Sequence, residues 1–250
     1  MLLAAGRGER MRPLTDTCPK PLLRAGGRTL IEWHLLALAR AGFAEVVINH
    51  AWLGERIETE LGDGSRWGLR IRYSPEPEAL ETAGGIAHAL PLLGPEPFAA
   101  IAADIHTDFD YRRLPALARR MRVDGLHAWC VLVPNPPHHP DGDFALREGR
   151  LRNDGRPRWT FSGIGLYDPH LFRGLAPTSN PGAGARNQPP RAALGPLLRA
   201  AADAGLAGGE CHDGLWVDVG TPQRLAWLDA QLRIGLADDR HPDDRNRHDG

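Results

Sequence analysis

A run of small and basic residues near the N-terminus has the composition of a phosphate-binding loop. It reads L-L-A-A-G-R-G-E-R-M-R-P-L-T over residues 2–15, and P-K-P-L-L follows at Pro19–Leu23. Gly6 and Gly8 carry no Cβ, so a glycine turn after a buried strand allows backbone N–H groups to converge on phosphate oxygens. Two glycines in this spacing, taken alone, are about as typical of a simple tight turn as of a phosphate-binding loop.

Two basic side chains strengthen the phosphate interpretation. Arg10 offers a planar fork of donors, and Lys20 offers a point charge suited to a phosphate undergoing substitution. The run lacks the third glycine of the dinucleotide-binding fingerprint and the G-K-[S/T] of a P-loop. Loop amides and two cations therefore favour a triphosphate site that is neither a dinucleotide-binding site nor a P-loop.

The complete run closely resembles the G-x-G-x-R-[L/M]-x-P-L-T…P-K-P signature of the sugar-phosphate nucleotidyltransferases, and the resemblance extends over roughly Met1 to Leu228. It implies an enzyme that joins a nucleoside triphosphate to a sugar 1-phosphate and releases pyrophosphate. Arg10 and Lys20 would be the catalytic charges. The resemblance assigns nucleotide binding to Leu3, Ala4, Ala5, Gly6 and Gly8.

The resemblance also implies two metal-binding aspartates. Asp104 stands where the family has N-G-D after its fourth strand, and Asp218 lies in a complete W-x-D-V-G-T match. Oxygen ligands suit Mg²⁺, the expected cofactor, although an aspartate at a strand end is often only a cap or turn residue. Ala102 and Ala103 replace the family's N-G, which predicts an extra methyl group close to the nucleotide.

A further small-residue segment, L-E-T-A-G-G-I at Leu80–Ile86, has a family counterpart that lies against the base and the incoming sugar. Glu81, Thr82 and Gly84 are the nucleotide-binding candidates there. The same segment is also typical of a helix N-terminus, and the two interpretations are compatible because helix N-termini attract anions.

Two segments indicate which sugar is used. N-P-P-H-H-P-D-G-D-F-A-L at Asn135–Leu146 and T-F-S-G-I-G-L-Y at Thr160–Tyr167 resemble the subgroup that couples UTP to N-acetylmuramate 1-phosphate in bacterial cell-wall recycling. The E-K-P segment of many glucose and deoxysugar enzymes is missing between them. Asp143 and Gly163 are the expected sugar-binding residues.

The sugar of that subgroup carries a lactyl carboxylate, which a guanidinium can bind in a bidentate manner. We therefore expect at least one arginine between the two segments to face the sugar, although any one of them is as consistent with a solvated loop. The candidates are Arg147, Arg150, Arg152, Arg156 and Arg158.

Three histidines invite a metal interpretation that their spacing does not favour. His138 and His139 lie between prolines without helical or C-x-x-C spacing, so we expect a surface loop. His106 follows Asp104 by two residues, and because magnesium disfavours imidazole we expect it in the pocket wall.

These residues require strands and helices that alternate along the chain. Short apolar or β-branched strands are predicted at 1–5, 45–50, 69–73, 98–103, 126–133 and 160–167. Helices are predicted at 53–61, 85–93, 114–122 and 191–204, and another begins at a Thr29–Glu32 capping box and ends at Gly42.

The alternation predicts an α/β fold, a mostly parallel twisted sheet with flanking helices, and the resemblance implies the Rossmann-like, GT-A-like nucleotidyltransferase variant. Ligands in such sheets bind at strand C-termini. Residues 1–236 form the expected domain, Pro177–Pro190 a low-complexity loop, and the charged segment 237–250 a disordered tail.

Composition narrows the other options. The 250 residues include 30 basic and 31 acidic ones, a net charge of -1 that does not favour nucleic acid as a partner. Cys18, Cys130 and Cys211 are too widely spaced for a zinc site or a disulfide framework, and no apolar run is long enough for a bilayer, so a cytoplasmic protein is expected. Two alternatives stay open: a relative acting on glucose or mannose 1-phosphate, and a non-catalytic nucleotide-sugar-binding regulator.

Overall fold

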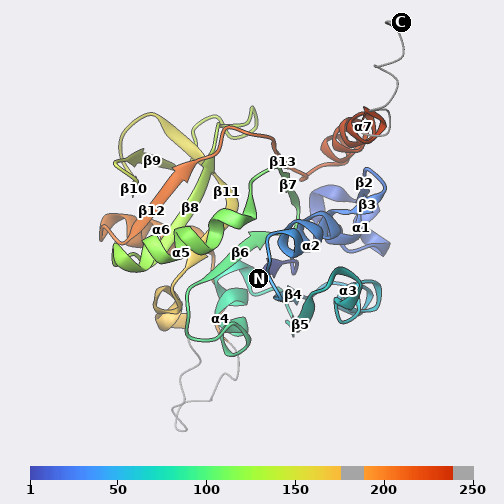
Figure 1. Cartoon of the computed structure of the whole chain (residues 1–250), viewed down its shortest axis with the longest axis horizontal. Coiled ribbons are helices and arrows are strands. Elements are labelled where there is room, and N and C mark those ends of the chain that lie inside the picture. Colours follow the sequence, from blue (N-terminus) through green and yellow to red (C-terminus); the bar gives the residue numbers. More distant parts are fainter. Residues whose placement is uncertain (176–188, 239–250) are drawn as a thin grey trace, which may run out of the picture.

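The computed structural model describes residues 1–175 and 189–238, which are organised around a nine-stranded sheet (Figure 1). The strand order is β5-β4-β1-β6-β11-β8-β12-β10-β9. The strands of this sheet are β1 (Leu2–Leu3), β4 (Glu45–His50), β5 (Arg70–Pro75), β6 (Phe98–Ala102), β8 (Ala128–Val133), β9 (Phe144–Arg147), β10 (Arg150–Arg152), β11 (Arg158–Tyr167) and β12 (Ala207–Cys211). Two small antiparallel ladders join β2 (Arg24–Ala25) to β3 (Arg28–Thr29) and β7 (Ile105–Thr107) to β13 (Trp216–Asp218).

The sheet is parallel in its first half and mixed in its second. Strands β5, β4, β1 and β6 run parallel, and Leu2 of the central β1 pairs with both Ile48 and Ile101. Strand β11 is antiparallel to both β6 and β8, whereas β12 is parallel to β8. The expectation of a mostly parallel sheet thus describes the four N-terminal strands, where strands and helices alternate regularly in the sequence.

Helices cover both faces of the sheet. They are α1 (Leu14–Thr17), α2 (Leu30–Arg40), α3 (Gly54–Leu61), α4 (Glu81–Leu93), α5 (Leu114–Val123), α6 (Leu194–Asp203) and α7 (Pro222–Asp238). Short 3-10 turns lie at Glu9–Met11, Lys20–Leu22, Ser65–Trp67, Tyr111–Arg113 and Pro169–Leu175. Among the described residues, no helix combines the length and the apolar character needed to cross a membrane.

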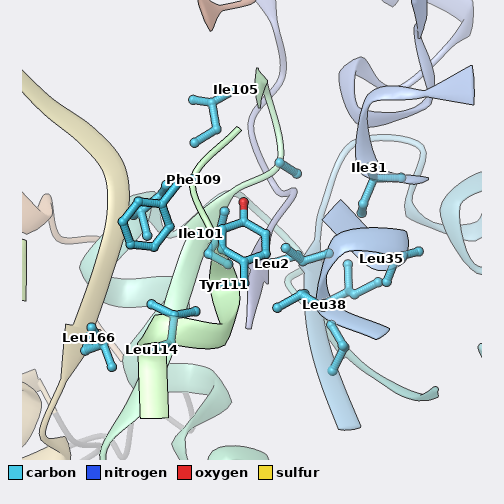
Figure 2. Packing of buried hydrophobic residues seen from close by; sticks show 14 of the residues in the cluster. Leu2, Ile31, Leu35, Leu38, Ile101, Ile105, Phe109, Tyr111, Leu114 and Leu166 are labelled. Carbon is cyan, nitrogen blue, oxygen red and sulfur yellow. The ribbon is translucent and has the colours of Figure 1, made fainter. Parts of the chain in front are cut away.

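Alternation of side chains along the strands divides the core into two layers. On one face, α2, α3 and α5 pack on Leu2, Ile48 and Ile101; Figure 2 shows Leu2 and Ile101 together with Ile31 and Leu35 of α2. On the other face, α4 and α6 pack on the strand residues that alternate with these, such as Ala100 of β6 and Cys130 of β8. Because successive side chains of a strand point to opposite faces, each central strand contributes to both layers.

Several predicted elements have the expected bounds. Strand β4 spans 45–50, and α2 starts at the Thr29–Glu32 capping box, in which Glu32 N donates to Thr29 Oγ1 (3.3 Å) and Thr29 N donates to Glu32 Oε2 (2.8 Å). Helix α4 begins at Glu81, four residues before the predicted start, so the segment expected to precede the helix forms its first turn.

The C-terminal part contains an element that the sequence reading did not predict. Helix α7 reaches Asp238, and its Leu228 packs with Met11, Leu23 and Val217 in a third apolar cluster. This cluster fixes the segment that carries the glycine loop. Residues 239–250 of the expected tail, and 177–188 of the expected low-complexity loop, lie outside the described residues.

Candidate active site

The glycine loop follows β1 and folds back on itself. Gly8 has a φ of 69°, and its carbonyl accepts hydrogen bonds from Met11 N (2.9 Å) and from Thr15 Oγ1 (2.9 Å). A Cβ on Gly8 would lie 3.0 Å from a methyl carbon of Thr15 and 3.2 Å from Lys20 Cβ. Glycine is therefore required there for the left-handed backbone and for close packing against the Lys20 stem.

Lys20 is the chain's single lysine, and it is buried at the base of this loop. Its ammonium group donates a hydrogen bond to Asp104 Oδ2, and only 9% of the lysine side chain is exposed, against 37% of the aspartate. The two predicted residues, 84 positions apart, are thus brought together. A buried ammonium requires a partner of opposite charge, and Asp104 supplies it.

A cavity of about 220 Å³ opens beside this ion pair at the C-terminal edge of the parallel strands. Six of the eight predicted nucleotide-binding residues line it: Leu3, Ala4, Ala5, Gly6, Glu81 and Thr82. Lys20, Asp104 and Ala102 line it too, whereas Gly8 and Gly84 do not. The predicted nucleotide-binding segments therefore converge on one cavity despite lying far apart in sequence.

Two buried polar residues that the sequence reading missed support the wall of this cavity. Asn49 Oδ1 accepts a hydrogen bond from Ala4 N (3.0 Å), and its Nδ2 donates to Glu76 Oε1 (2.6 Å). Glu76 Oε2 accepts from Leu80 N (2.8 Å) at the entry to α4. This chain of bonds ties the loop after β1 to the start of α4. The signal available in the sequence was a polar asparagine at the end of the apolar run E-V-V-I-N-H.

The first turn of α4 stands at the edge of the cavity. Glu81 has a φ of 59°, a conformation that costs a residue with a Cβ on the order of 1 kcal/mol or more. Its carboxylate pairs with Arg191 (3.0 Å). Strain held at the rim of a cavity is typical of functional sites.

Gly84 has a packing role instead of a place in the cavity wall. The N–H groups of Ala83 and Gly84 both donate to Ala192 O (2.9 and 3.1 Å), and a Cβ on Gly84 would lie 2.7 Å from Pro190 O. These two amides of the helix start are therefore already occupied, which leaves the amides of Glu81 and Thr82 as the ones that an anion could reach.

The second predicted metal ligand lies beside the first. In the β7–β13 ladder Asp218 pairs with Ile105, the residue after Asp104, and Val219 N donates to Asp104 O (2.9 Å). Asp218 Oδ2 accepts from Arg224 Nη1 (2.9 Å). Arg10 reaches the same place, because a Cβ on Gly220 would lie 3.0 Å from Arg10 Nη2 and 3.1 Å from Asp218 Oδ1.

A buried histidine of α2 forms a hydrogen bond with the backbone of β7. His34 Nε2 lies 2.8 Å from Ile105 O, and His34 Nδ1 lies 2.8 Å from the Tyr111 hydroxyl. Burial lowers the pKa of His34 from 6.5 to about 4, so the ring is neutral at pH 7. A neutral ring that donates from Nε2 to the carbonyl accepts a hydrogen bond from the Tyr111 hydroxyl at Nδ1, and this fixes its tautomer.

The donor set suits a hard divalent cation. Two carboxylates held by neighbouring strands provide oxygen ligands, the chemistry that Mg²⁺ prefers, while the remaining coordination is normally completed by water and phosphate oxygens. Each carboxylate is balanced by a basic partner, Asp104 by Lys20 and Asp218 by Arg224. Within residues 1–175 and 189–238, no group of three or more His, Cys, Asp or Glu side chains has the arrangement of a protein-only metal site.

A second, larger cavity of about 470 Å³ adjoins the first. Leu3, Glu81, Thr82 and Ala102 line both, so the two cavities adjoin along a shared wall, and we refer to the pair as the trough. The two predicted sugar-binding residues, Asp143 and Gly163, lie in the wall of the second cavity together with Phe144, Phe161, Tyr167, Ala193, Leu194, Gly195, Leu198 and Arg199.

A β-bulge shapes this cavity. The register of β11 against β8 shifts between Phe161 and Gly165, and Gly163 there has a φ of 84°. A Cβ on Gly163 would lie 2.9 Å from Ala102 Cβ, so a larger residue would crowd the wall that the second cavity shares with Ala102. Bulges of this kind commonly re-aim backbone and side chains next to active sites.

One expectation about the histidines is confirmed and another is wrong. His138 and His139 lie in a loop, as expected, with 42% and 41% of their side chains exposed. Their Nε2 atoms lie 3.4 Å from Asp218 Oδ2 and 3.2 Å from Asp143 Oδ1. His106 packs edge-on against Trp33 (ring centroids 5.5 Å apart) and lines neither cavity, which contradicts the pocket-wall expectation. Burial lowers the pKa of His106.

Two further expectations fail for packing reasons. The methyl group of Ala103 is fully buried in the core layer of α2 and α5, so it does not crowd the nucleotide. None of the five arginines between the two sugar segments lines the second cavity. Arg158 lies behind its wall, where Nη2 donates to Asp143 O (2.6 Å) and Nη1 to Asn153 O (2.9 Å).

Comparisons with known proteins agree with this geometry. Residues 1–142 match the family model described as Nucleotidyl transferase. A Neisseria meningitidis N-acetylmuramate alpha-1-phosphate uridylyltransferase is 51% identical over 230 residues, covering 90% of this chain and 94% of the relative. A Caulobacter vibrioides protein of the same name is 33% identical over 245 residues, covering 95% and 97%.

Relatives named for other sugars and bases match either a shorter part of the chain or most of it at lower identity. A Mycobacterium tuberculosis mannose-1-phosphate guanylyltransferase is 34% identical over 124 residues, half of this chain and 34% of the relative. The fold is shared with a Bacillus anthracis crystal structure assigned as a glucose-1-phosphate thymidylyltransferase, with a TM-score of 0.75 at 20% identity over 93% of this chain and 94% of the other.

Proposed function

This chain belongs to the nucleotidyl transferase family, and from this premise we propose that it couples UTP to N-acetylmuramate α-1-phosphate with the aid of Mg²⁺. The products are UDP-N-acetylmuramate and pyrophosphate. The observation that carries the proposal is the trough of two adjoining cavities, with the Lys20–Asp104 pair beside one and the predicted sugar residues in the other.

The chemistry is a substitution at the α-phosphorus of UTP. An oxygen of the sugar phosphate forms a new P–O bond while the bond to the β-phosphate breaks, and pyrophosphate leaves with the electron pair. Catalysis of this kind depends mainly on positioning and on charge neutralisation, so no protein nucleophile is needed.

The residues of this chain supply both requirements. The loop after β1 and the first turn of α4 bind and orient the nucleotide along the shared wall of the trough. Lys20 and Arg10 carry positive charge toward the phosphates, and Lys20 is fixed in place by burial and by Asp104. A charge held in position before the reaction stabilises the transition state without reorganisation at that moment.

Asp104 and Asp218 are the residues that would hold the magnesium ion. When bound, the ion neutralises phosphate charge that accumulates as pyrophosphate leaves. Arg224 and Lys20 balance the two carboxylates, and we expect both to contact the same phosphates.

Supporting the choice of sugar are the two long matches to N-acetylmuramate alpha-1-phosphate uridylyltransferases and the sugar segments that form the wall of the second cavity. A volume of about 470 Å³ is within the usual range for small-molecule sites. We further propose the cytoplasm as the location, since UTP is available there and Cys18, Cys130 and Cys211 are all free.

The deciding experiment measures pyrophosphate release from UTP with N-acetylmuramate 1-phosphate, N-acetylglucosamine 1-phosphate, glucose 1-phosphate and mannose 1-phosphate in turn. The proposal expects kcat/KM for the first to exceed that for each other sugar by tenfold or more, about 1.4 kcal/mol. Equal or reversed preference would overturn the muramate assignment. No release with any sugar, combined with binding of a nucleotide sugar, would support the non-catalytic alternative.

A further inference from the structure

We propose that Arg199 of α6 binds the carboxylate of the acceptor sugar and thereby sets its preference for an acidic hexosamine 1-phosphate. The inference rests on the proposed function, which it deepens. It starts from the second cavity, where Arg199 is the one basic side chain among the described residues of the lining.

The sequence of α6 places this arginine at the cavity. Leu194 and Leu198 are buried and hold one side of the helix in the core, next to α4. Gly195 precedes Arg199 by four residues, so the two share a helix face. A helical side chain leans toward the N-terminus of its helix, and the absence of a side chain on Gly195 leaves that path open to Arg199. A Cβ built on Gly195 meets nothing within 4 Å.

The guanidinium is oriented without being neutralised. Its central carbon lies 5.5 Å from the ring centroid of Phe144, another residue of the cavity wall. A cation over an aromatic face gains modest attraction and loses rotational freedom while its N–H groups stay available. In the part of the chain that the structure describes, no carboxylate forms an ion pair with Arg199, and only its backbone carbonyl takes part in a hydrogen bond, which it accepts from Asn153 Nδ2 (2.8 Å).

The acids of the same cavity are already engaged. Asp143 Oδ2 accepts from Phe161 N (2.8 Å), and its Oδ1 lies 3.2 Å from His139. Glu81 pairs with Arg191. These two carboxylates would repel an acidic ligand that had no basic partner, so a sugar carboxylate needs Arg199 more than a neutral sugar does.

The 1-phosphate of the acceptor sugar is a second anion that Arg199 could bind. The sugar 1-phosphate is also bound by guanidinium groups, and a site that reads the phosphate would treat all sugar 1-phosphates alike. The length of the trough separates the two sources: the phosphate must reach the Lys20–Asp104 end, whereas Arg199 lines only the second cavity. The carboxylate is therefore the favoured ligand, and kinetics with two sugars distinguishes it from the phosphate.

The test compares wild type, Arg199→Gln and Arg199→Lys with N-acetylmuramate 1-phosphate and N-acetylglucosamine 1-phosphate, which differ in the lactyl group. Arg152→Gln is the matched control, because Arg152 is an exposed arginine outside the cavity lining. We expect Arg199→Gln to raise KM for the muramate substrate tenfold or more and to leave KM for UTP and for the glucosamine substrate within twofold. Arg199→Lys should fall between wild type and Arg199→Gln, since a point charge replaces a bidentate fork.

Each other outcome has a defined meaning. An equal rise in KM for both sugars would overturn the carboxylate assignment in favour of the phosphate. No change with either sugar would overturn any anion-reading role of Arg199. If wild type itself shows no preference for the muramate substrate, the proposed function fails, a result independent of the variant. Unchanged melting temperature and UTP affinity verify that the variants fold.

Discussion

Replacing Lys20 with methionine tests most directly whether a fixed positive charge in the site stabilises the transition state. Methionine keeps most of the unbranched stem that packs against Gly8 but removes the ammonium group, so the loop retains its support. A preorganised charge stabiliser typically contributes a factor of 10² to 10³ in rate, roughly 3–4 kcal/mol of transition-state stabilisation. We expect kcat for pyrophosphate release to fall by about a hundredfold or more.

The same substitution makes a distinct prediction for stability. Removing one partner of a fully buried ion pair costs about 3–5 kcal/mol because the other charge stays buried. Asp104 keeps 37% of its side chain exposed, so water can solvate it, and a loss of about 1–2 kcal/mol is more appropriate. Urea denaturation should therefore show a folded variant with a modestly lower free energy of unfolding.

Metal dependence separates Lys20 from the carboxylates. Lys20 occupies Asp104 Oδ2, so its removal should leave the Mg²⁺ concentration for half-maximal rate unchanged or lower, whereas Asp104→Asn should raise it. Because Lys20 is the only lysine, an amine-reactive reagent followed by peptide mapping reports on this side chain separately from the terminal amine, and UTP should protect it. A kcat within threefold of wild type, with no protection by UTP, would refute the assignment of Lys20 to the triphosphate.

Three further predictions concern the metal ligands, the sugar cavity and the fold. Asp104→Asn and Asp218→Asn should each abolish turnover in Mg²⁺ with an unchanged circular dichroism spectrum; near-normal activity of either would contradict the metal pair. Gly163→Ala places a Cβ 2.9 Å from Ala102 Cβ at a φ of 84°, so KM for the sugar phosphate should rise more than KM for UTP, and an opposite order would count against the cavity assignment. Burial lowers the pKa of His34 to about 4, so the unfolded chain takes up this proton first, and the free energy of unfolding should fall by up to about 3 kcal/mol as pH drops from 6.5 to 4. His34→Gln should flatten that slope in urea titrations, and an unchanged slope would assign it to other groups.

The predicted site residues that the fold brings together share one property: each was predicted from a local sequence pattern. The glycine loop, Lys20 and the aspartate of W-V-D-V-G-T all lie in continuous motifs, and Lys20 and Asp104 meet because strand C-termini of a parallel sheet lie at one edge. Element types were predictable for the same reason, since apolar periodicity and a capping box are local signals.

Side chains that support the site from distant segments could not be predicted from local patterns. Asn49 and Glu76 hold the cavity wall through side-chain bonds to one another and to backbone groups, and neither has a motif of its own. The neutral histidine under β7 is another case, since its role depends on Tyr111, 77 positions away. Such partners are determined by tertiary packing, which a single sequence does not display.

The arginine expectation shows how proximity along the chain can mislead. The carboxylate argument requires a guanidinium in the sugar cavity, and the arginine-rich segment between the two sugar motifs offered five. Its turns carry those side chains away from the lining, with Arg158 donating to Asp143 O from behind the wall. We propose that Arg199 meets the chemical requirement from α6, a helix that lines the cavity together with β9 and β11. The type of residue followed from the ligand, whereas its position followed from the packing of α6 against β10, β12 and α4, which no local pattern in the sequence displays.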